Sequence, residues 1–348
     1  MKILLTRDEF RKKVFERDNH SCVICKAKAV DAHHIIERRL FDNGGYYIDN
    51  GASLCPECHI RAEQTIISCE DIRIAANIST VILPEEFGYD ETYDKWGNPI
   101  LPDGRRVRGE LFFDNSVQKI LKDGGVIDLF TEWVKYPKTK HLPWSKGQTK
   151  GDKSYSQEDV EKLFAGKEIV ITEKMDGENS SIYTNYLHAR SIDGRNHPSR
   201  NWLKNLHSKI KYSIPEGWRI CGENLFAKHS IFYKNLPSYF LAFAIFDEKN
   251  NCLQWDEFVE WCNLLDIIHV PLLYRGIFDE EKIKKCYTGK SVYEGSDVQE
   301  GYVLRLTNEI PFVQYKKSLA KFVRENHVQT NHNWMYQEIT KNELTKEG

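Results

Sequence analysis

A lysine at position 174 begins the pattern Lys-x-Asp-Gly, which ends at Gly177. It follows an apolar stretch, 169–171, that predicts a buried strand. A lysine at the end of such a strand can attack the α-phosphorus of a nucleotide and hold the nucleotide as a phosphoramide. Lysine is protonated at pH 7, so burial or nearby cations must first lower its pKa. The pattern recurs by chance, so the prediction depends on the segments that follow it.

Three further segments follow in the order that a nucleotidyltransferase needs: 188–191, then 221–224 with an aromatic strand at 239–243, and finally 300–305 with 313–317. These motifs resemble the covalent nucleotidyltransferase superfamily of ATP-dependent ligases and capping enzymes. Within it, the chain is most similar to the RNA ligases related to the phage type-2 enzyme. The resemblance covers roughly residues 133–345 and includes two longer stretches, 222–231 and 327–330.

The resemblance implies a role for each motif residue. Lys174 is the nucleophile that becomes lysyl-AMP, although a salt bridge to a surface carboxylate is the structural alternative. Glu173, through its side chain or its backbone carbonyl, accepts a hydrogen bond from the adenine amine. Arg190 touches the ribose or a phosphate. Glu223 holds the ribose hydroxyls, because a carboxylate accepts from a vicinal diol.

The later motifs complete the expected nucleotide pocket. Phe243 fits the aromatic that stacks on adenine, whereas Phe240 points to the other face of the same strand and is expected in the core. Glu300 binds the catalytic metal, directly or through water. Lys316, or Lys317 as the second choice, supplies positive charge as pyrophosphate leaves.

Nine cysteines are unevenly spread, and four of them form two Cys-x-x-Cys pairs near the N-terminus. Each pair can present two thiolates from one tight turn, and two such turns close a tetrahedral Zn²⁺ site. Chance reduced thiols are the alternative. The predicted ligands are Cys22, Cys25, Cys55 and Cys58.

The residues around these pairs resemble the HNH endonuclease family, over about residues 7–66. The resemblance implies that His33 ligates a catalytic divalent ion and that His34 activates water for attack on a phosphodiester. Asn50 then orients His34 through a side-chain or backbone hydrogen bond. His59 and Glu63 complete the metal site, with Glu63 standing where many relatives have histidine. A zinc-stabilised module that binds nucleic acid without cutting it is the alternative.

The bulk composition is that of a soluble globular protein, with 348 residues, 41% hydrophobic and 29% charged. A formal net charge of −2 gives no global basic field, so nucleic acid needs a local basic cleft. The first residues are too weakly apolar for a signal peptide, and no stretch approaches a membrane span. We expect a cytoplasmic protein whose partner is nucleic acid (RNA ends or a nicked duplex), with no membrane association; the oligomeric state stays open.

These motifs must be positioned by an α+β protein. We expect a small ββα-metal (HNH) zinc module followed by an ATP-grasp-like nucleotidyltransferase core of antiparallel sheets with helices. The expected helices lie near 115–122, 157–164, 200–210, 255–265 and 279–286. Only 32 residues follow Lys316, too few for a C-terminal OB domain. The expected parts are an HNH-like zinc-binding domain at 1–75, an ordered linker at 76–132, in which Trp96 packs on a neighbouring domain, and an RNA ligase nucleotidyltransferase domain at 133–348.

The sequence thus predicts an ATP-dependent RNA ligase that joins 5′-phosphate and 3′-hydroxyl ends through lysyl-AMP and adenylylated-strand intermediates. Its cofactors are ATP, Mg²⁺ or Mn²⁺, and Zn²⁺, and its HNH module nicks or binds nucleic acid. Lys321 and Arg324 are expected to grip acceptor phosphates. The alternative is an HNH endonuclease, or a zinc nucleic-acid-binding module, with a DNA-ligase-like nucleotidyltransferase partner domain.

Overall fold

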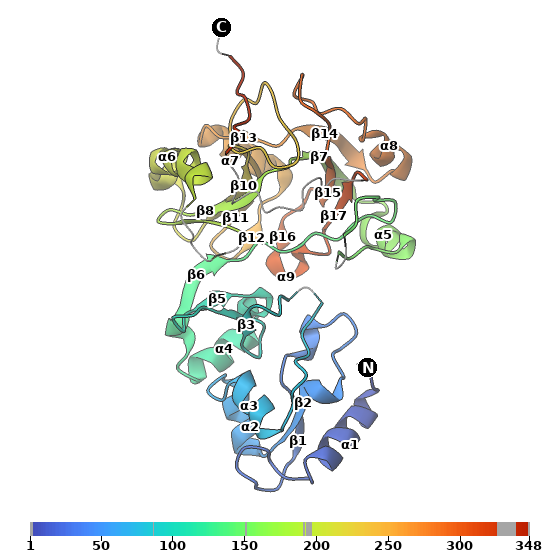
Figure 1. Ribbon diagram of the computed structural model, residues 1–348, viewed down its shortest axis with the longest axis vertical. Coiled ribbons are helices and arrows are strands. Elements are labelled where there is room, and N and C mark those ends of the chain that lie inside the picture. Colours follow the sequence, from blue (N-terminus) through green and yellow to red (C-terminus); the bar gives the residue numbers. More distant parts are fainter. Residues whose placement is uncertain are drawn as a thin grey trace. The chain divides into compact units, whose positions relative to one another are not determined.

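The computed structural model describes residues 3–85, 87–149, 152–190, 192, 197–325 and 339–346. The chain divides into two compact units, Met1–Lys135 and Tyr136–Gly348 (Figure 1). Ser191 and the stretch 327–330, which the predicted ligase motifs include, lie outside the described residues.

The first part of the first unit is a ββα arrangement. The helix α1 begins at a capping box, in which Thr6 accepts from the backbone of Glu9 and the Glu9 side chain accepts from Thr6. The strands β1 and β2 pair antiparallel, with His33 opposite Ala52. This arrangement confirms the predicted zinc-module fold. Its elements are α1 (Arg7–Arg17), β1 (Asp31–His34), β2 (Gly51–Leu54), α2 (Pro56–Glu63) and α3 (Cys69–Ala75).

The segment expected as a linker is folded with this module. Four short strands form a sheet in the order β3-β4-β5-β6, and a helix covers it. Trp96 is buried in the core of this part, while Ile82 and Tyr93 join the core of the zinc module. The packing therefore continues from the module through residue 135. The elements are β3 (Thr92–Tyr93), β4 (Pro99–Ile100), β5 (Arg106–Arg108), α4 (Asn115–Asp123) and β6 (Phe130–Val134).

The second unit contains two sheets (Figure 1). The larger follows the order β16-β12-β11-β10-β8-β9, with β13 paired parallel to β11, and its other pairings are antiparallel. Its strands are β8 (Glu178–Ile182), β9 (Leu187–Ala189), β10 (Arg219–Asn224), β11 (Phe240–Phe246), β12 (Asn251–Cys252), β13 (Ile268–His269) and β16 (Ile310–Pro311).

The smaller sheet is wholly antiparallel and carries the Lys-x-Asp-Gly motif. Its order is β14-β7-β15-β17, so β7 lies between two partners. Residues 169–171 of β7 are fully buried, as their unbroken apolar character predicts. The antiparallel α+β core is therefore confirmed. The strands are β7 (Glu168–Lys174), β14 (Leu272–Ile277), β15 (Gly301–Leu306) and β17 (Leu319–Val323).

Helices cover one face of each sheet. α5 and α8 pack on the smaller sheet, and α6 and α7 pack on the larger. Among the described residues of this unit, four of the five α-helices lie within one residue of their predicted ranges, and α9 was not predicted. They are α5 (Gln157–Phe164), α6 (Asn201–Ile210), α7 (Trp255–Leu264), α8 (Glu280–Lys285) and α9 (Phe312–Tyr315).

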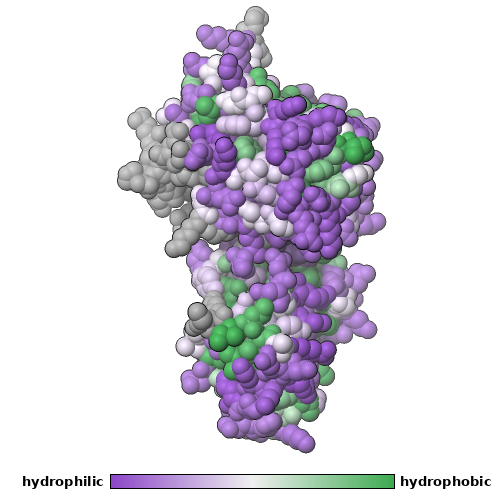
Figure 2. Space-filling view, turned by 90° about the vertical axis from the view of Figure 1, so that its right-hand side faces the viewer, coloured by the Kyte–Doolittle hydropathy of each residue, from purple (hydrophilic) through white to green (hydrophobic). Residues whose placement is uncertain are grey.

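The surface agrees with the composition. On the face drawn in Figure 2 most of the coloured surface is hydrophilic, and apolar side chains gather in only a few places. Among the described helices, none combines the length and the apolar character that crossing a membrane requires.

Candidate functional site

The amine of Lys174 lies against a carboxylate from the neighbouring strand. Lys174 is the last residue of β7 and pairs with Gly301 of β15, so Glu300 falls directly beside it. Lys174 Nζ donates to Glu300 Oε2 at 2.6 Å. A Cβ on Gly301 would lie 1.9 Å from the carbonyl oxygen of Phe322, so only glycine permits this approach of β15 and β17.

The rest of the motif fixes the loop after Lys174. Asp176 Oδ2 accepts from the backbone N–H of Ser230 at 2.7 Å and of Ile231 at 2.9 Å. Gly177 donates its N–H to Glu223 Oε1 at 3.2 Å. A Cβ on Gly177 would meet the backbone of β10 at 2.6 Å. Aspartate and glycine in Lys-x-Asp-Gly thus position the loop and leave the lysine for chemistry.

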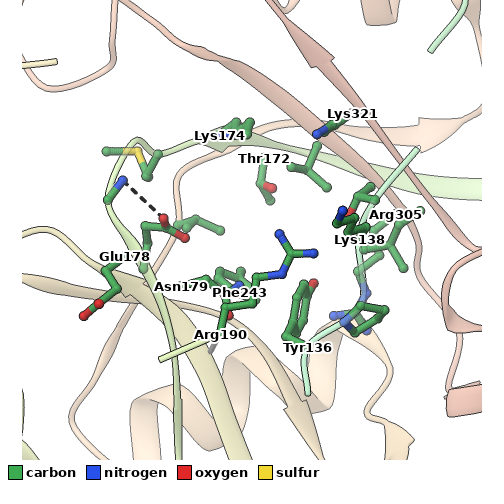
Figure 3. Close-up of a pocket in the computed structure, with 18 of the residues that line it drawn as sticks. Tyr136, Lys138, Thr172, Lys174, Glu178, Asn179, Arg190, Phe243, Arg305 and Lys321 are labelled. Carbon is green, nitrogen blue, oxygen red and sulfur yellow. Dashed lines mark hydrogen bonds between the residues drawn. The ribbon is translucent and has the colours of Figure 1, made fainter. Parts of the chain in front are cut away.

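A cavity of about 610 Å³ opens at this point in the second unit (Figure 3). Its wall includes five of the residues predicted to hold nucleotide: Glu173, Lys174, Arg190, Glu223 and Phe243. Glu300 reaches the cavity through its bond to Lys174. The volume is within the range of small-molecule sites.

Two carboxylate or amide oxygens in the wall offer acceptors to a ligand. Glu173 Oε2 accepts from the N–H of Val292 at 3.0 Å. Within the described part of the chain, Glu173 Oε1 and Asn179 Oδ1 are buried and have no hydrogen-bond partner. A buried acceptor without a hydrogen-bond partner destabilises the folded protein. These two oxygens can therefore accept hydrogen bonds from the N–H or O–H groups of a bound nucleoside.

The aromatic side of the cavity is built on β11. Phe243 lines the cavity, whereas Phe240 is fully buried in the core. The rings of Phe243 and Tyr136 meet edge to face, with centroids 5.1 Å apart. The Tyr136 hydroxyl shares a 2.9 Å hydrogen bond with that of Tyr315. Tyr136, held by Tyr315, thus fixes the orientation of the Phe243 ring in the cavity wall.

Arginines occupy the same wall with different constraints. Figure 3 shows the Arg190 side chain extending into the cavity beside Tyr136. Arg200 is instead held by Glu178, whose two oxygens accept from its guanidinium at 2.8 and 2.5 Å. Arg190, which extends into the cavity, is placed to meet a phosphate or ribose, while Arg200 holds β8 in place.

The last lysine motif differs from the expectation. Lys316 and Lys317 do not line the cavity, and they directly follow the short helix α9, formed by residues 312–315. The carbonyl of Lys316 accepts from the Tyr155 hydroxyl at 2.6 Å. The strand β17 begins only at Leu319, and it brings Lys321 to the wall opposite Val303 of β15. Figure 3 shows Lys321 and Lys174 on the same side of the cavity.

Burial and charge set the protonation of these groups. Burial alone would lower the pKa of Lys174, but Glu300 and Glu223 raise it above its ordinary value. Burial raises the pKa of Glu300 and of Glu223, and the Lys174 ammonium opposes both shifts. Burial, with the Lys174 charge, lowers the pKa of Lys321 to about 8. A nucleophilic Lys174 therefore needs another cation to take up the charge of Glu300.

The four cysteines of the two Cys-x-x-Cys pairs converge as predicted. Their sulfur atoms all lie within 4.8 Å of one another, and Cys25 and Cys55 are 3.5 Å apart. Burial would raise the pKa of the Cys22 thiol, but backbone hydrogen bonds at Cys25, Cys55 and Ile24 lower it to about 7. Four thiols at this spacing fit a tetrahedral Zn²⁺, which they would hold as a structural ion.

A second group of metal-ligand side chains lies between β1 and α2. The ligand atoms of His33, His59 and Glu63 are within 4.8 Å of one another. Glu63 Oε1 is 3.4 Å from His33 Nδ1 and 3.3 Å from His59 Nε2. Both ring nitrogens of His33 are buried and, in the described chain, lack a hydrogen-bond partner. The set fits a divalent metal with an imidazole-carboxylate shell.

His34 and Asn50 are arranged differently from the expectation. The His34 ring stacks on Phe10 at 4.5 Å and meets Tyr46 edge to face at 5.2 Å. Burial and the nearby Lys95 charge lower its pKa to about 4, so the ring is neutral at pH 7. The Asn50 side chain bonds to the backbone of Ile36 and Gly45 rather than to the His34 ring. Asn50 therefore fixes the loop that follows β1.

Several wall residues had no predicted role. Tyr136 precedes the family motifs, and Asn179 closes the run after Lys174. Arg305 is 4% exposed, with its guanidinium bonded to the carbonyls of Leu306 and Leu253. An arginine at the end of the apolar run 302–304 was a sequence signal for Arg305. Tyr136 carried no comparable signal.

Comparison with known proteins gives two family matches. Residues 167–323 match the family model of RNA ligase, and residues 22–65 match that of HNH endonuclease. A Naegleria gruberi RNA ligase solved with ATP and Mn is 16% identical over 54% of this chain and 58% of that chain, with a TM-score of 0.38. An archaeal ATP-dependent RNA ligase is 15% identical over 78% of this chain and 64% of that chain, also at 0.38. The chain thus spans less than two thirds of either structure, and no curated protein matches it.

Proposed function

We propose that this chain, in which an RNA ligase-family domain follows an HNH endonuclease-family module, is an ATP-dependent RNA ligase. The observation that carries the proposal is the 2.6 Å pair of Lys174 and Glu300 beside a cavity of about 610 Å³. An amine, a ribose-binding carboxylate, an aromatic ring and two further cations line this single cavity, which are the groups needed to bind and transfer AMP.

The first reaction is the transfer of AMP to Lys174. The neutral amine attacks the α-phosphorus of ATP, the bond to the β-phosphate oxygen breaks, pyrophosphate leaves with that electron pair, and the new N–P nitrogen releases one proton to water. Glu300 orients the amine by its hydrogen bond and would offer its carboxylate to Mg²⁺ or Mn²⁺. A divalent ion held there would supply positive charge that lowers the pKa of Lys174 and stabilises the leaving group.

The cavity wall holds the nucleotide in the orientation that this attack requires. Phe243 packs against the adenine face, and Glu223 accepts from the ribose hydroxyls. The unpartnered Oε1 of Glu173 accepts from the adenine amine. Arg190 and Lys321 contact the phosphates. Lys321 takes the part that the sequence assigned to Lys316 or Lys317.

The remaining reactions join two nucleic-acid ends. The 5′-phosphate of one strand attacks the lysyl-AMP phosphorus, which frees the lysine and gives a 5′–5′ adenylylated strand. The 3′-hydroxyl of the other strand then attacks the 5′-phosphate, and AMP leaves. RNA ends or a nicked duplex are the proposed substrates. A reducing compartment, the cytoplasm, suits a chain whose cysteines are all free thiols.

Sealing of nicked duplexes tests this proposal. Four duplexes with RNA or DNA on either side of the nick, with ATP and Mg²⁺, should be sealed best where RNA flanks the nick. Lys174→Ala should fail with ATP, yet seal a strand that is adenylylated beforehand, because that last step needs no lysine nucleophile. Failure of the folded wild-type protein on all four duplexes, adenylylated strands included, would reject the assignment.

A second activity is favoured by the cluster of His33, His59 and Glu63. With the neutral His34 ring nearby, it has the parts of a metal-dependent nuclease. Plasmid or RNA should then be nicked in Mn²⁺, and His34→Ala should abolish nicking. Binding of nucleic acid without any nicking would assign the module to targeting.

A further inference from the structure

A buried lysine reaches the second metal-ligand group from outside the HNH motifs. Lys95 lies in the turn between β3 and β4 and is only 4% exposed to solvent. Its Nζ donates to the carbonyl of His34 at 3.0 Å and to Glu37 Oε2 at 3.3 Å. It also lies 3.2 Å from Glu63 Oε1. These three oxygens match the three protons of an ammonium.

The position of the ammonium matters because of the oxygen that it contacts. Glu63 Oε1 is also the atom that faces His33 and His59, at 3.4 and 3.3 Å. That oxygen is the carboxylate atom closest to both imidazoles, so a divalent ion bound by these three side chains would take it as a ligand. Lys95 therefore already holds the one anionic donor of the group, and a second cation there would meet its charge at short range.

The backbone around Lys95 fixes it in this place. The Lys95 carbonyl accepts from the N–H of Glu37 at 2.9 Å. The next residue, Trp96, donates its indole N–H to the carbonyl of Glu63 at 2.8 Å and is 3% exposed. Asp94 accepts from the N–H groups of Trp96 and Asn98 and so closes the turn. The turn thus fastens Lys95 to both β1 and α2.

We propose that Lys95 is an internal cation of this site, which competes with a divalent metal for Glu63. Without metal, its ammonium neutralises Glu63 and keeps the ligand group together. When metal binds, the ammonium gives up Glu63 and keeps only its bonds to His34 and Glu37. The inference rests on the proposed metal role of His33, His59 and Glu63, and it makes the nuclease site one of low metal affinity that the β3–β4 turn controls.

Titration of the full chain with Mn²⁺ tests the competition. Zinc is loaded first to fill the cysteine site, and free Mn²⁺ is then counted by electron paramagnetic resonance. His33→Ala provides the background from all other sites. Lys95→Met should bind Mn²⁺ at this site at least about tenfold more tightly than wild type, because the competing charge is gone. Lys95→Arg keeps the charge and should show no gain.

The titration distinguishes competition by Lys95 from metal binding by His33, His59 and Glu63. Equal or weaker binding by Lys95→Met, with binding lost in His33→Ala, overturns the competition and leaves the metal site. No binding by any of the proteins overturns both. Zinc content and thermal unfolding establish that each variant is folded.

A measurement on the wild-type protein avoids any folding defect of the variants. Lys95 should resist an amine-modifying reagent in the metal-free protein and become more reactive as Mn²⁺ is added, as mass spectrometry of its peptide would report. Lys122, which lies on α4 outside the site, is the control and should not change. Unchanged protection of Lys95 at saturating Mn²⁺ overturns the proposal.

Discussion

Lys174 and Glu300 set each other's charge. In the nucleotide-free protein the two carboxylates near Lys174 raise its pKa, so the amine keeps its proton and does not react. A cation that binds Glu300 removes this support and frees the amine. The same pair therefore explains both the resting state of the lysine and the need for a divalent metal in the proposed reaction.

Lys321 lines the cavity whereas Lys316 and Lys317 do not, and the proposed role of Lys321 in the transfer of AMP can be measured. Lys321→Ala should slow lysyl-AMP formation about 10²-fold or more, because it removes a cation from the cavity wall. Lys316→Ala and Lys317→Ala serve as matched controls, since neither side chain lines the cavity. The measurement is the single-turnover rate of label transfer from α-labelled ATP. A large loss in Lys316→Ala with a small one in Lys321→Ala would restore the motif expected from sequence.

The lowered pKa of Lys321 predicts that the rate of lysyl-AMP formation depends on pH. Burial and the Lys174 charge lower the pKa of Lys321 to about 8, so its positive charge is complete below that pH and is lost as pH rises past it. Lys321→Arg keeps the charge at every pH used. The ratio of wild-type to Lys321→Arg rates should therefore fall as pH rises from about 7 to about 9. A flat ratio would show that this charge does not act in the reaction.

At the scale of single residues, sequence reasoning identified side chains whose chemistry is written in local motifs. Lys174, Glu223 and Glu300 meet at one place because β7 pairs with β15 and because Gly177, in the loop after Lys174, donates its N–H to Glu223. Lys95 could not be predicted in the same way. Its partner Glu63 lies thirty-two positions earlier, and only the fold of the β3–β4 turn brings them together.

At the scale of elements, the pairing of β15 with β17 is what brings Lys321 to the cavity. Gly301→Ala should destabilise the second unit by about 1–3 kcal/mol, because the added Cβ meets the Phe322 carbonyl. Chemical denaturation measures the change. Gly276→Ala is the matched control on β14, where the nearest atom is the movable Tyr274 hydroxyl. Equal stability of the two variants would contradict the tight approach of β15 and β17.

Element prediction succeeded where a local signal is strong and failed where the signals compete. The helix α5 lies within its predicted range because its capping box and its apolar face agree. Residues 312–317 contain aromatic and β-branched side chains that favour a strand, yet one helical turn forms there. Pro311 at its start and packing of Phe312 and Tyr315 on the aromatic core outweigh local preference. This one difference displaced the lysine assignment.

At the scale of the whole molecule, the two units have separate cores and different demands on metal. Removal of zinc should unfold the first unit and leave AMP transfer to Lys174 unchanged, because structural zinc sites contribute folding energy directly. Zinc can be removed with a chelator, after which Mg²⁺ is added back for the AMP-transfer assay. Cys58→Ser should give the same result as this treatment. Two-step thermal unfolding and label transfer are the readouts.

The matched control for zinc loss is Cys69→Ser. Cys69 is equally buried in the first unit, and its thiol donates to the carbonyl of Ile35 rather than joining the four-cysteine group. It should keep bound zinc and the first unfolding step. Loss of AMP transfer together with zinc would show that the ligase domain depends on the module.

The most direct test of the account is to locate the covalent nucleotide. The full-length protein is incubated with ATP and Mg²⁺, digested under conditions that preserve phosphoramides, and its peptides are identified by mass spectrometry. The account predicts one AMP on Lys174, absent from Lys174→Ala. AMP on a different residue, or none on a folded protein that binds ATP, would contradict it.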